Sequence, residues 1–316
     1  MAAELTVLAG DVGGSRTRLA LAAPGIGVTA LQSFANDSFT SLEDVLKAYC
    51  AQPGFPPLQG ACLAVAGPVR EGQFHLSNRN WQGDADSITA ALQLPASAKA
   101  NVVNDLAALC HALPALIPGQ LSCLQPGQHG GGQALVAGIG TGFNVSASLN
   151  GGVLAAELGR ASLPQAVYRR LQELLDHEPE NAASIEMLFS GAGLVRFHQA
   201  LTGSAASSAE GIVAACLASP DSPEARTVCE WAHLLGLMAR ELTAAYLPAQ
   251  GLFFAGSVAR GVLNTPARSR FLESFTAPGG QLRAVCAGTP LWLITDDAAG
   301  VGGAARVALA AAGADV

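Results

Sequence analysis

Asp11-Val-Gly-Gly-Ser-Arg-Thr-Arg18 separates two short apolar stretches near the start of the chain. Leu5 to Gly10 has the pattern of a strand, and Thr17 to Ala22 has that of a returning strand. The stretch therefore predicts a β-hairpin and not a strand-turn-helix unit. Its adjacent glycines can offer consecutive backbone N–H groups to a phosphate, because glycine permits unusual φ angles and close approach of the chain. An ordinary tight turn is the competing interpretation.

A second glycine turn follows the same plan in the middle of the chain. Gly138-Ile-Gly-Thr-Gly142 lies between an expected strand at Ala134 to Gly138 and a returning strand at Phe143 to Leu149. The spacing is G-x-G-x-G and leads into a strand, which disfavours a dinucleotide-binding fold. A third turn, Gly256-Ser257, follows an expected strand at Leu252 to Ala255, and a simple strand-to-helix connection is its alternative interpretation.

The remaining pattern alternates strands and helices. We expect a buried strand at Ala61 to Ala66, a loop at Ile117 to Gln133, mostly helix from Pro164 to Leu247, and an Ala-rich helix from about Ala299. With a glycine hairpin in each half, the sequence predicts an α/β protein of two related lobes.

Composition excludes several classes of protein. The 316 residues carry a net charge of −7 and only two lysines, Lys47 and Lys99, neither of which follows a glycine, so no P-loop exists. Without a Lys/Arg cluster, nucleic acid is not an expected partner. The uncharged run Leu106 to Ala156 is broken by glycines and prolines, so no membrane segment is expected. Seven scattered cysteines and the lack of a basic signal-peptide region favour a cytoplasmic protein.

Four segments together resemble a known superfamily. They look like the first phosphate, connecting, second phosphate and adenosine motifs of the sugar-kinase and actin-like ATPase superfamily, and they are Asp11 to Arg18, Val103-Asn-Asp-Leu106, Gly138 to Gly142, and Phe253-Phe-Ala-Gly256. The chain is most similar to bacterial glucokinases, over about Val7 to Leu309. That similarity rests on Ala66-Gly-Pro68, Ser77-Asn-Arg-Asn-Trp81, Asn104-Asp105, Gly140-Thr-Gly142, Glu157, Glu186 before Ser190-Gly-Ala-Gly193, and Asp296-Asp-Ala-Ala-Gly300.

The resemblance implies a fold and an activity. The fold is an α/β, two-lobed actin-like ATPase (ribonuclease H-like) fold with a cleft between a small domain, residues 1–108 and 299–316, and a large domain, residues 109–298. The activity is ATP:hexose 6-phosphotransfer with glucose as the default sugar. The resemblance is also compatible with a homodimer. The implied cofactors are ATP and Mg²⁺, with Asp11 holding Mg²⁺ through water. The ATP-binding residues would be Gly10, Asp11, Gly13, Gly14, Ser15, Gly140, Thr141, Gly142, Gly256 and Ser257.

Four further residues complete the implied site. Asp105 is the expected general base, because a sugar hydroxyl needs a positioned carboxylate to accept its proton during phosphoryl transfer. The alternative is that Asp105 is only an acid at a helix N-terminus, where the helix dipole favours a negative charge. Asn104 can serve both as helix N-cap and as a ligand of a sugar hydroxyl. Glu157 and Glu186 are the implied pair that binds hydroxyls near the anomeric end of the sugar, and surface acids are the alternative.

One residue departs from the family pattern. Bacterial glucokinases have Glu-Gly-Gly-His where this chain has Glu157-Leu-Gly-Arg160. Arginine only donates hydrogen bonds and stays charged, so Arg160 is expected either to balance Glu157 or Glu186, the favoured interpretation, or to recognise a changed substrate. The alternatives to glucose are therefore another hexose or an amino sugar such as N-acetylglucosamine. A non-catalytic sugar or nucleotide sensor is a further alternative.

Overall fold

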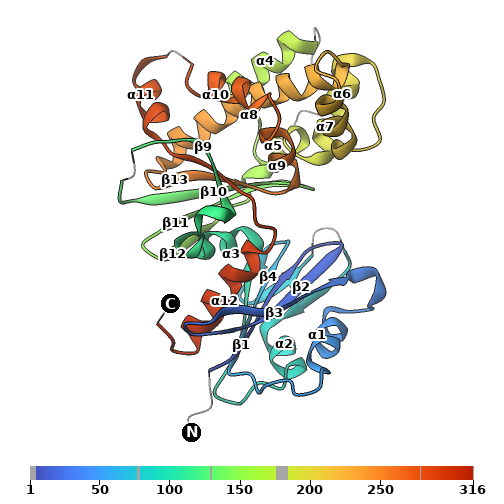
Figure 1. Ribbon diagram of the computed structural model, residues 1–316, viewed down its shortest axis with the longest axis vertical. Helices are drawn as coiled ribbons and strands as arrows, with labels where there is room; N and C mark the ends of the chain where they lie inside the picture. The colour runs from blue at the N-terminus through green and yellow to red at the C-terminus, as the bar shows by residue number, and fades with distance from the viewer. Residues whose placement is uncertain (1–4, 77–78, 129, 176–183, 278, 316) are drawn as a thin grey trace. The chain divides into compact units, whose positions relative to one another are not determined.

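The computed structural model describes residues 5–76, 79–128, 130–175, 184–277 and 279–315. Contacts divide the chain into two compact units, shown in Figure 1. Unit 1 comprises Met1–Leu116 and Asp296–Val316, and unit 2 comprises Ile117–Thr295. The sequence analysis places the domain boundaries at 108/109 and 298/299, and these boundaries stay a prediction.

Unit 1 is built on a five-stranded sheet in the order β3-β2-β1-β4-β8. Antiparallel pairing joins β3 to β2 and β2 to β1, and parallel pairing joins β1 to β4 and β4 to β8. The strands are β1 Val7–Val12, β2 Arg16–Ala23, β3 Gly27–Ala35, β4 Gly60–Val65 and β8 Ala100–Asn104. A small second sheet contains β5 Val69–Arg70, β6 Gln73–His75 and β7 Gln82–Asp84.

Helices cover both faces of the larger sheet in unit 1. Alternate residues of β1 point to opposite faces, so Leu8 packs in the cluster that includes α1 and α2, while Val7 packs with α3 and α12. The helical segments are η1 Asn36–Ser38, α1 Leu42–Cys50, α2 Ala85–Ala91, α3 Asp105–Ala112, η2 Leu113–Ala115 and α12 Ala299–Ala311. Gly303 lets α12 approach α3 closely, because a Cβ there would collide with the carbonyl oxygen of Ala108.

Unit 2 repeats the same strand arrangement. Its sheet has the order β12-β11-β10-β13-β14-β9, in which β12, β11 and β10 form an antiparallel meander and β10, β13 and β14 run parallel. The strands are β9 Leu121–Gln125, β10 Gln133–Ile139, β11 Phe143–Leu149, β12 Gly152–Ala155, β13 Gly251–Ala255 and β14 Leu291–Ile294. The expected glycine hairpin in each half of the chain is therefore confirmed.

The core of unit 2 is organised around one long helix, α8 Pro223–Tyr246. Its apolar face includes Trp231, which is fully buried and donates from Nε1 to the carbonyl oxygen of Leu188. The helical segments around it are η3 Pro118–Gln120, η4 Leu158–Arg160, α4 Gln165–Leu175, α5 Ile185–Leu188, α6 Gly191–Thr202, α7 Ala209–Ala218, α9 Ser257–Leu263, α10 Arg268–Phe275 and α11 Gly280–Gly288.

The prediction of a loop from Ile117 to Gln133 is wrong over part of that segment. The segment contains η3 and the strand β9, which pairs antiparallel with β14. The sequence separation of the partners is about 170 residues, so no local pattern could reveal this pairing. The sequence prediction also left out β3, an edge strand whose residues are nearly all exposed and which therefore lacks the alternation of a half-buried strand.

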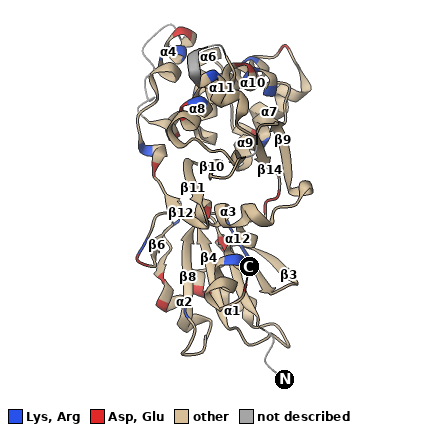
Figure 2. Cartoon of the chain, turned by 90° about the vertical axis from the view of Figure 1, so that its left-hand side faces the viewer, with Lys and Arg blue, Asp and Glu red and all other residues tan. Residues whose placement is uncertain are grey.

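Charged residues are sparse in both units. Figure 2 shows Lys and Arg positions spread over several helices and strands, with most of the ribbon uncharged. Among the described residues, no helix is both long and apolar enough to cross a lipid bilayer.

Candidate active site

The first glycine turn joins β1 to β2 in unit 1. Asp11 and Arg18 are cross-strand partners in this hairpin, and Arg18 Nη1 lies 3.2 Å from Asp11 Oδ2. The Gly13 N–H donates to the carbonyl oxygen of Arg16 at 2.9 Å and closes the turn. Burial raises the pKa of Asp11, and the Arg18 guanidinium opposes that increase. The hairpin therefore presents a paired carboxylate beside a tight glycine turn.

Asn104 and Asp105 lie where β8 ends and α3 begins, also in unit 1. Asn104 is the N-cap of α3, because its Oδ1 accepts from the Leu106 N–H at 3.0 Å. Its Nδ2 donates to the carbonyl oxygen of Gly67 at 3.0 Å, which fixes the amide plane. Asp105 Oδ1 also accepts from the Leu106 N–H, at 2.9 Å. The capping role expected for Asn104 is confirmed.

Asp105 has the electrostatic environment of a proton acceptor. Burial, and then the negative charge of Asp11, raise the pKa of Asp105 to about 7. An ordinary solvated acid at a helix N-terminus would have a lowered pKa, since the helix dipole favours the charged form. The raised value places the carboxyl where it can exchange a proton near neutral pH, as a general base requires.

The second glycine turn connects β10 to β11 in unit 2. Within it the Gly140 N–H donates to the carbonyl oxygen of Gly142 at 3.0 Å. The carbonyl oxygen of Gly140 accepts from the Gly191 N–H at 2.8 Å, which ties the turn to the start of α6. Thr141 is exposed at the tip of the turn.

The third glycine turn lies beside the second one. A Cβ on Gly140 would come within 3.9 Å of the Ser257 nitrogen. Gly256 has φ +96°, and a Cβ on it would collide with the carbonyl oxygen of Ile139 at the end of β10. Only glycine accommodates both the backbone angle and this close approach. Unit 2 therefore brings the second phosphate turn and Gly256-Ser257 together.

Glu186 lies against the second phosphate turn. Its Oε2 accepts from the Phe143 N–H at 3.1 Å, immediately after Gly142. A Cβ on Gly142 would collide with the same oxygen. The carboxylate is half-buried in the first turn of the short helix α5. A purely solvated helix acid does not fit this placement.

The loop that carries Glu157 is held by Asn144, a residue that the sequence analysis missed. Asn144 Nδ2 donates to the carbonyl oxygen of Ala156 at 2.5 Å, and Asn144 Oδ1 accepts from the Leu158 N–H at 2.9 Å. These bonds fix the backbone on both sides of Glu157, whose side chain is exposed. A Cβ on Gly159 would collide with the Phe143 carbonyl oxygen, so this loop packs directly on the start of β11.

Arg160 does not form the expected ion pair. Its side chain is exposed at the end of η4, and within the described residues it makes no salt bridge with Glu157 or Glu186. Glu186 instead accepts a hydrogen bond through Oε2 from the Phe143 N–H of β11.

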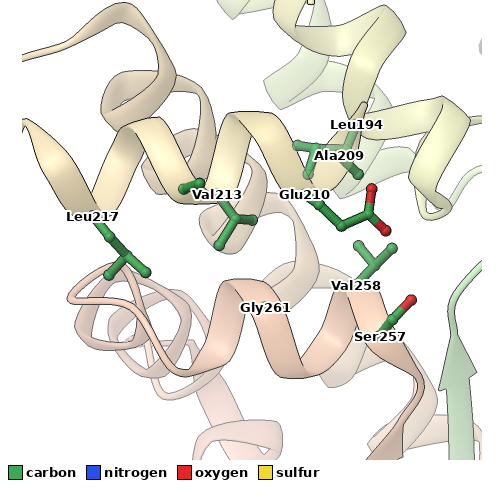
Figure 3. A pocket seen from close by; sticks show the side chains of 9 residues that line it. Leu194, Ala209, Glu210, Val213, Leu217, Ser257, Val258 and Gly261 are labelled. Atoms are coloured by element: carbon green, nitrogen blue, oxygen red, sulfur yellow. The ribbon is translucent and has the colours of Figure 1, made fainter. Parts of the chain in front are cut away.

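An apolar pocket of about 230 Å³ lies next to the third glycine turn. Figure 3 shows the carboxylate of Glu210 and the hydroxyl of Ser257 toward one end, and Leu217 at the other. The other residues lining the pocket come from α6, α7 and α9, and they are Leu194, Ala209, Val213, Ala214, Val258 and Gly261. The mostly apolar lining, with polar groups toward one end, suits an apolar group with a polar edge.

Some expected site residues have another clear structural role or lie partly outside the described residues. Gly10 is buried inside β1, where the absence of a Cβ makes room for Leu19 and Leu63. Its contact with ATP stays a prediction. Of the segment Ser77 to Trp81, the first two residues lie outside the described residues. Asn104 and Asp105 belong to unit 1, while Glu157, Arg160 and Glu186 belong to unit 2.

Known proteins with similar sequences and structures point to one family. The family model described as Glucokinase matches residues 8–311. A glucokinase of Marinobacter nauticus is 29% identical over 97% of this chain and 98% of its own length. The crystal structure of a glucokinase from an Antarctic psychrotroph is 27% identical, with a TM-score of 0.80 over 96% of this chain and 98% of that chain.

A more distant structure shares the fold. It is a ROK family glucokinase from Streptomyces griseus in complex with glucose and AMPPNP, with 18% identity and a TM-score of 0.65 over 96% of this chain and 99% of that chain. The expected α/β actin-like ATPase fold is confirmed. With a family model matched over nearly the whole length, the chain belongs to the glucokinase family of ATP-dependent hexose kinases.

Proposed function

We propose that this protein transfers the γ-phosphoryl group of ATP to the 6-hydroxyl of a hexose, with glucose as the first candidate. The single observation that carries the proposal is Asp105, a half-buried carboxyl whose pKa is raised to about 7 by desolvation at the N-terminus of α3. The 6-hydroxyl must lose its proton as its oxygen attacks phosphorus, and Asp105 accepts that proton. A non-catalytic sensor would have no use for a carboxyl adjusted in this way.

The side chains proposed as sugar ligands are two in each unit, and each pair is described by itself. Asn104, fixed by its bond to the carbonyl oxygen of Gly67, offers its amide to a sugar hydroxyl. The carboxylates of Glu157 and Glu186 accept hydrogen bonds from hydroxyls near the anomeric carbon, as ionised acids do. Asp105 contacts the reacting hydroxyl itself. Positioning of this kind provides much of the rate in phosphoryl transfer, because the transition state needs little covalent help.

The nucleotide is held by backbone groups and an apolar pocket. In unit 1 the N–H groups of Gly14 and Ser15 are offered to a phosphate, and in unit 2 the turn at Gly140 to Gly142 is the second candidate for phosphate binding. The adenine ring enters the pocket beside Ser257, with Glu210 as an acceptor at its polar edge. Exposed Ser15 and Thr141 can each add a hydroxyl donor.

The residues around Asp11 fit Mg²⁺. One of its carboxylate oxygens is bonded to Arg18, and the other is left to accept from water in the shell of a hard cation. Protein sites commonly hold Mg²⁺ through one or two carboxylates and the substrate phosphates. When bound, the ion neutralises charge that develops on the phosphate oxygens.

We expect the nucleotide pocket to respond to volume at position 261. In Gly261→Leu, the added side chain would occupy the pocket, and the KM for ATP should rise about tenfold, or ~1.4 kcal/mol, while the sugar KM stays unchanged. Gly261→Ala is the matched control, because its Cβ would lie at an ordinary 3.4 Å from Val213. Steady-state kinetics on both variants would test this. A normal KM for ATP in Gly261→Leu would show that the adenine ring does not bind in this pocket.

The pKa of Asp105 predicts a pH dependence. As general base it acts only when deprotonated, so kcat should rise with pH to a plateau above about 7. The measurement is kcat at saturating ATP and sugar between about pH 5.5 and 8.5. The residual activity of Asp105→Asn should lack this step. A wild-type profile that is flat across the range would contradict the assignment.

A second candidate substrate follows from Arg160. Because this guanidinium is exposed and unpaired within the described residues, it can donate to an acceptor that glucose lacks, such as the acetyl carbonyl of N-acetylglucosamine. The test is an assay of sugar-dependent ADP release with glucose, mannose, fructose, galactose and N-acetylglucosamine. Turnover of N-acetylglucosamine far above that of glucose would replace glucose as the proposed substrate. No ADP release with any sugar would contradict the kinase proposal.

Arg160→His restores the family residue and separates the two substrates. We expect glucose turnover to stay nearly intact or improve. Loss of a charged hydrogen bond to an acetyl group would lower kcat/KM for N-acetylglucosamine by about 1–3 kcal/mol. Thermal unfolding should change little, because the residue forms no ion pair to lose. A large fall in glucose kcat/KM would instead make Arg160 a ligand of glucose.

A further inference from the structure

One buried residue donates hydrogen bonds to the backbone carbonyl oxygens of the first glycine turn. Asn36, in η1, is completely buried. Its Nδ2 donates to the carbonyl oxygens of Gly13, at 2.8 Å, and Gly14, at 3.2 Å. Its main-chain N–H donates to the carbonyl oxygen of Ser15 at 3.0 Å. Asn36 therefore bonds three consecutive carbonyl oxygens of the turn.

The orientation of the Asn36 amide is fixed chemically. Thr17, also fully buried, donates from Oγ1 to Asn36 Oδ1 at 2.8 Å. The reversed amide would put an oxygen against the carbonyl oxygens of Gly13 and Gly14, which cannot donate. The Asn36 NH₂ group therefore faces the turn.

Arg79 adds a second contact on the same side. Its Nε donates to the carbonyl oxygen of Gly14 at 3.0 Å, and its Nη1 donates to the carbonyl oxygen of Asn36 at 3.2 Å. The guanidinium also pairs with Asp37 and lies 4.8 Å from the centre of the Trp81 ring. Arg79 thus holds both the turn and the segment that carries Asn36.

These bonds determine which groups of the turn remain for a ligand. The Gly13 N–H is used within the turn, whereas the N–H groups of Gly14 and Ser15 make no hydrogen bond among the described residues. In a planar peptide the N–H points away from the C=O, so fixing the carbonyls on one side directs the free N–H groups to the other. The carbonyl oxygens, which would repel an anion, are held away from the same position.

We propose that Asn36 is a positioning residue for phosphate binding, which presets the Gly13–Ser15 turn with its N–H groups toward the nucleotide phosphates. Thr17 orients Asn36, and Arg79 holds the turn from the same side. The inference rests on the proposed role of this turn in ATP binding. Presetting a loop lowers the entropy lost on binding and so strengthens affinity without a direct contact.

The test is nucleotide binding to the purified, full-length protein. Asn36→Ala removes both side-chain bonds to the turn and should weaken ATP and ADP binding by about tenfold or more, from the lost hydrogen bonds and order of the turn. Adenosine, which lacks phosphate, should bind as it does to the wild-type protein. In kinetics the KM for ATP should rise while the sugar KM stays the same. Isothermal titration calorimetry with ATP, ADP and adenosine measures the first difference.

Two further variants keep the inference testable if Asn36→Ala does not fold. Thr17→Val removes the hydroxyl that orients Asn36 at almost constant volume, and Arg79→Lys removes the Nε bond to Gly14. Both should weaken ATP binding in the same direction by a smaller factor. Thr29→Val is the control, because its hydroxyl contacts Leu21 in the hairpin and not the turn.

The outcomes separate this inference from the function it rests on. Folded variants that bind ATP like the wild-type protein would overturn the role of Asn36 while the kinase proposal stands. Equal losses for ATP and adenosine would indicate general loosening, and would also overturn it. A wild-type protein that binds no ATP would overturn the proposed function and this inference together.

Discussion

Asp105→Asn is expected to lower kcat by about 10²–10⁴, or roughly 3–5 kcal/mol of activation free energy, because the proton acceptor is lost. Sugar binding should persist, since the amide oxygen of asparagine can still accept the Leu106 N–H that Asp105 Oδ1 accepts at 2.9 Å. Steady-state ADP release and calorimetric sugar titration measure the two properties separately. An unchanged kcat would remove Asp105 from the reaction.

The same variant should be more stable than the wild-type protein at high pH. The folded state raises the pKa of Asp105 to about 7 from the ordinary 3.8, so between these values the folded state binds more protons than the unfolded state. The wild-type free energy of unfolding therefore falls as pH rises through this range. Asparagine carries no such penalty, and above pH 7 the variant should gain about 1–3 kcal/mol. Denaturant unfolding at pH 5 and pH 8 measures this gain.

This combination distinguishes a catalytic group from a structural one. When a residue that serves only stability is replaced, the protein loses both activity and stability. A buried carboxyl with a raised pKa opposes folding in its charged form, so its removal should cost activity and increase stability. A fall in stability at pH 8 would show that bonds to the charged carboxylate outweigh its burial.

The sequence was sufficient for the hairpins and for the helix N-terminus at Asn104. These are local features, since glycine turns between apolar runs and an Asn-Asp pair before a helix each depend on a few neighbouring residues. The strand β9 could not be predicted in this way, because its partner β14 lies far along the chain. The exposed strand β3 was not predicted for a different reason, because it lacks the alternating apolar face of a half-buried strand.

The binding and catalytic roles of the predicted site residues stay predictions, and the sequence did not reveal the residues that hold their loops in place. Asn36 and Asn144 each hold a site loop through bonds to backbone carbonyl oxygens. No pattern in the sequence marks such residues, because a carbonyl oxygen belongs to every amino acid. The ion pair expected for Arg160 depends on where its loop places the guanidinium, and no local sequence pattern specifies that position.

Gly142 offers the sharpest test of the second phosphate turn. A Cβ at this position would collide with Glu186 Oε2, the oxygen that accepts from the Phe143 N–H. Gly142→Val should therefore displace the Glu186 carboxylate and also block approach of phosphate to the turn. We expect kcat/KM to fall for both ATP and sugar by about 10²-fold or more, or ~3 kcal/mol, with kcat lowered as well.

Two alanine substitutions in the same turn provide the comparison. A Cβ on Gly140 would meet only the Ser257 nitrogen and hydroxyl at 3.9 and 4.0 Å, which are ordinary contacts. Gly140→Ala should therefore keep near wild-type kinetics, whereas Gly142→Ala should show much of the loss seen with valine. Thermal unfolding of both variants shows whether they remain folded. Gly142→Ala with kinetic constants within about twofold of the wild-type values would contradict the close approach of Glu186 to the turn.

A double-mutant cycle then identifies the route of the effect. If Gly142→Ala acts by displacing Glu186, adding it to Glu186→Ala should cause little further loss in kcat/KM for the sugar, because the displaced group is already absent. If it acts by blocking phosphate, the two losses should add, and the KM for ATP should rise in both backgrounds. Strong non-additivity confined to the sugar constants would make Glu186 the link between the phosphate turn and the bound hexose.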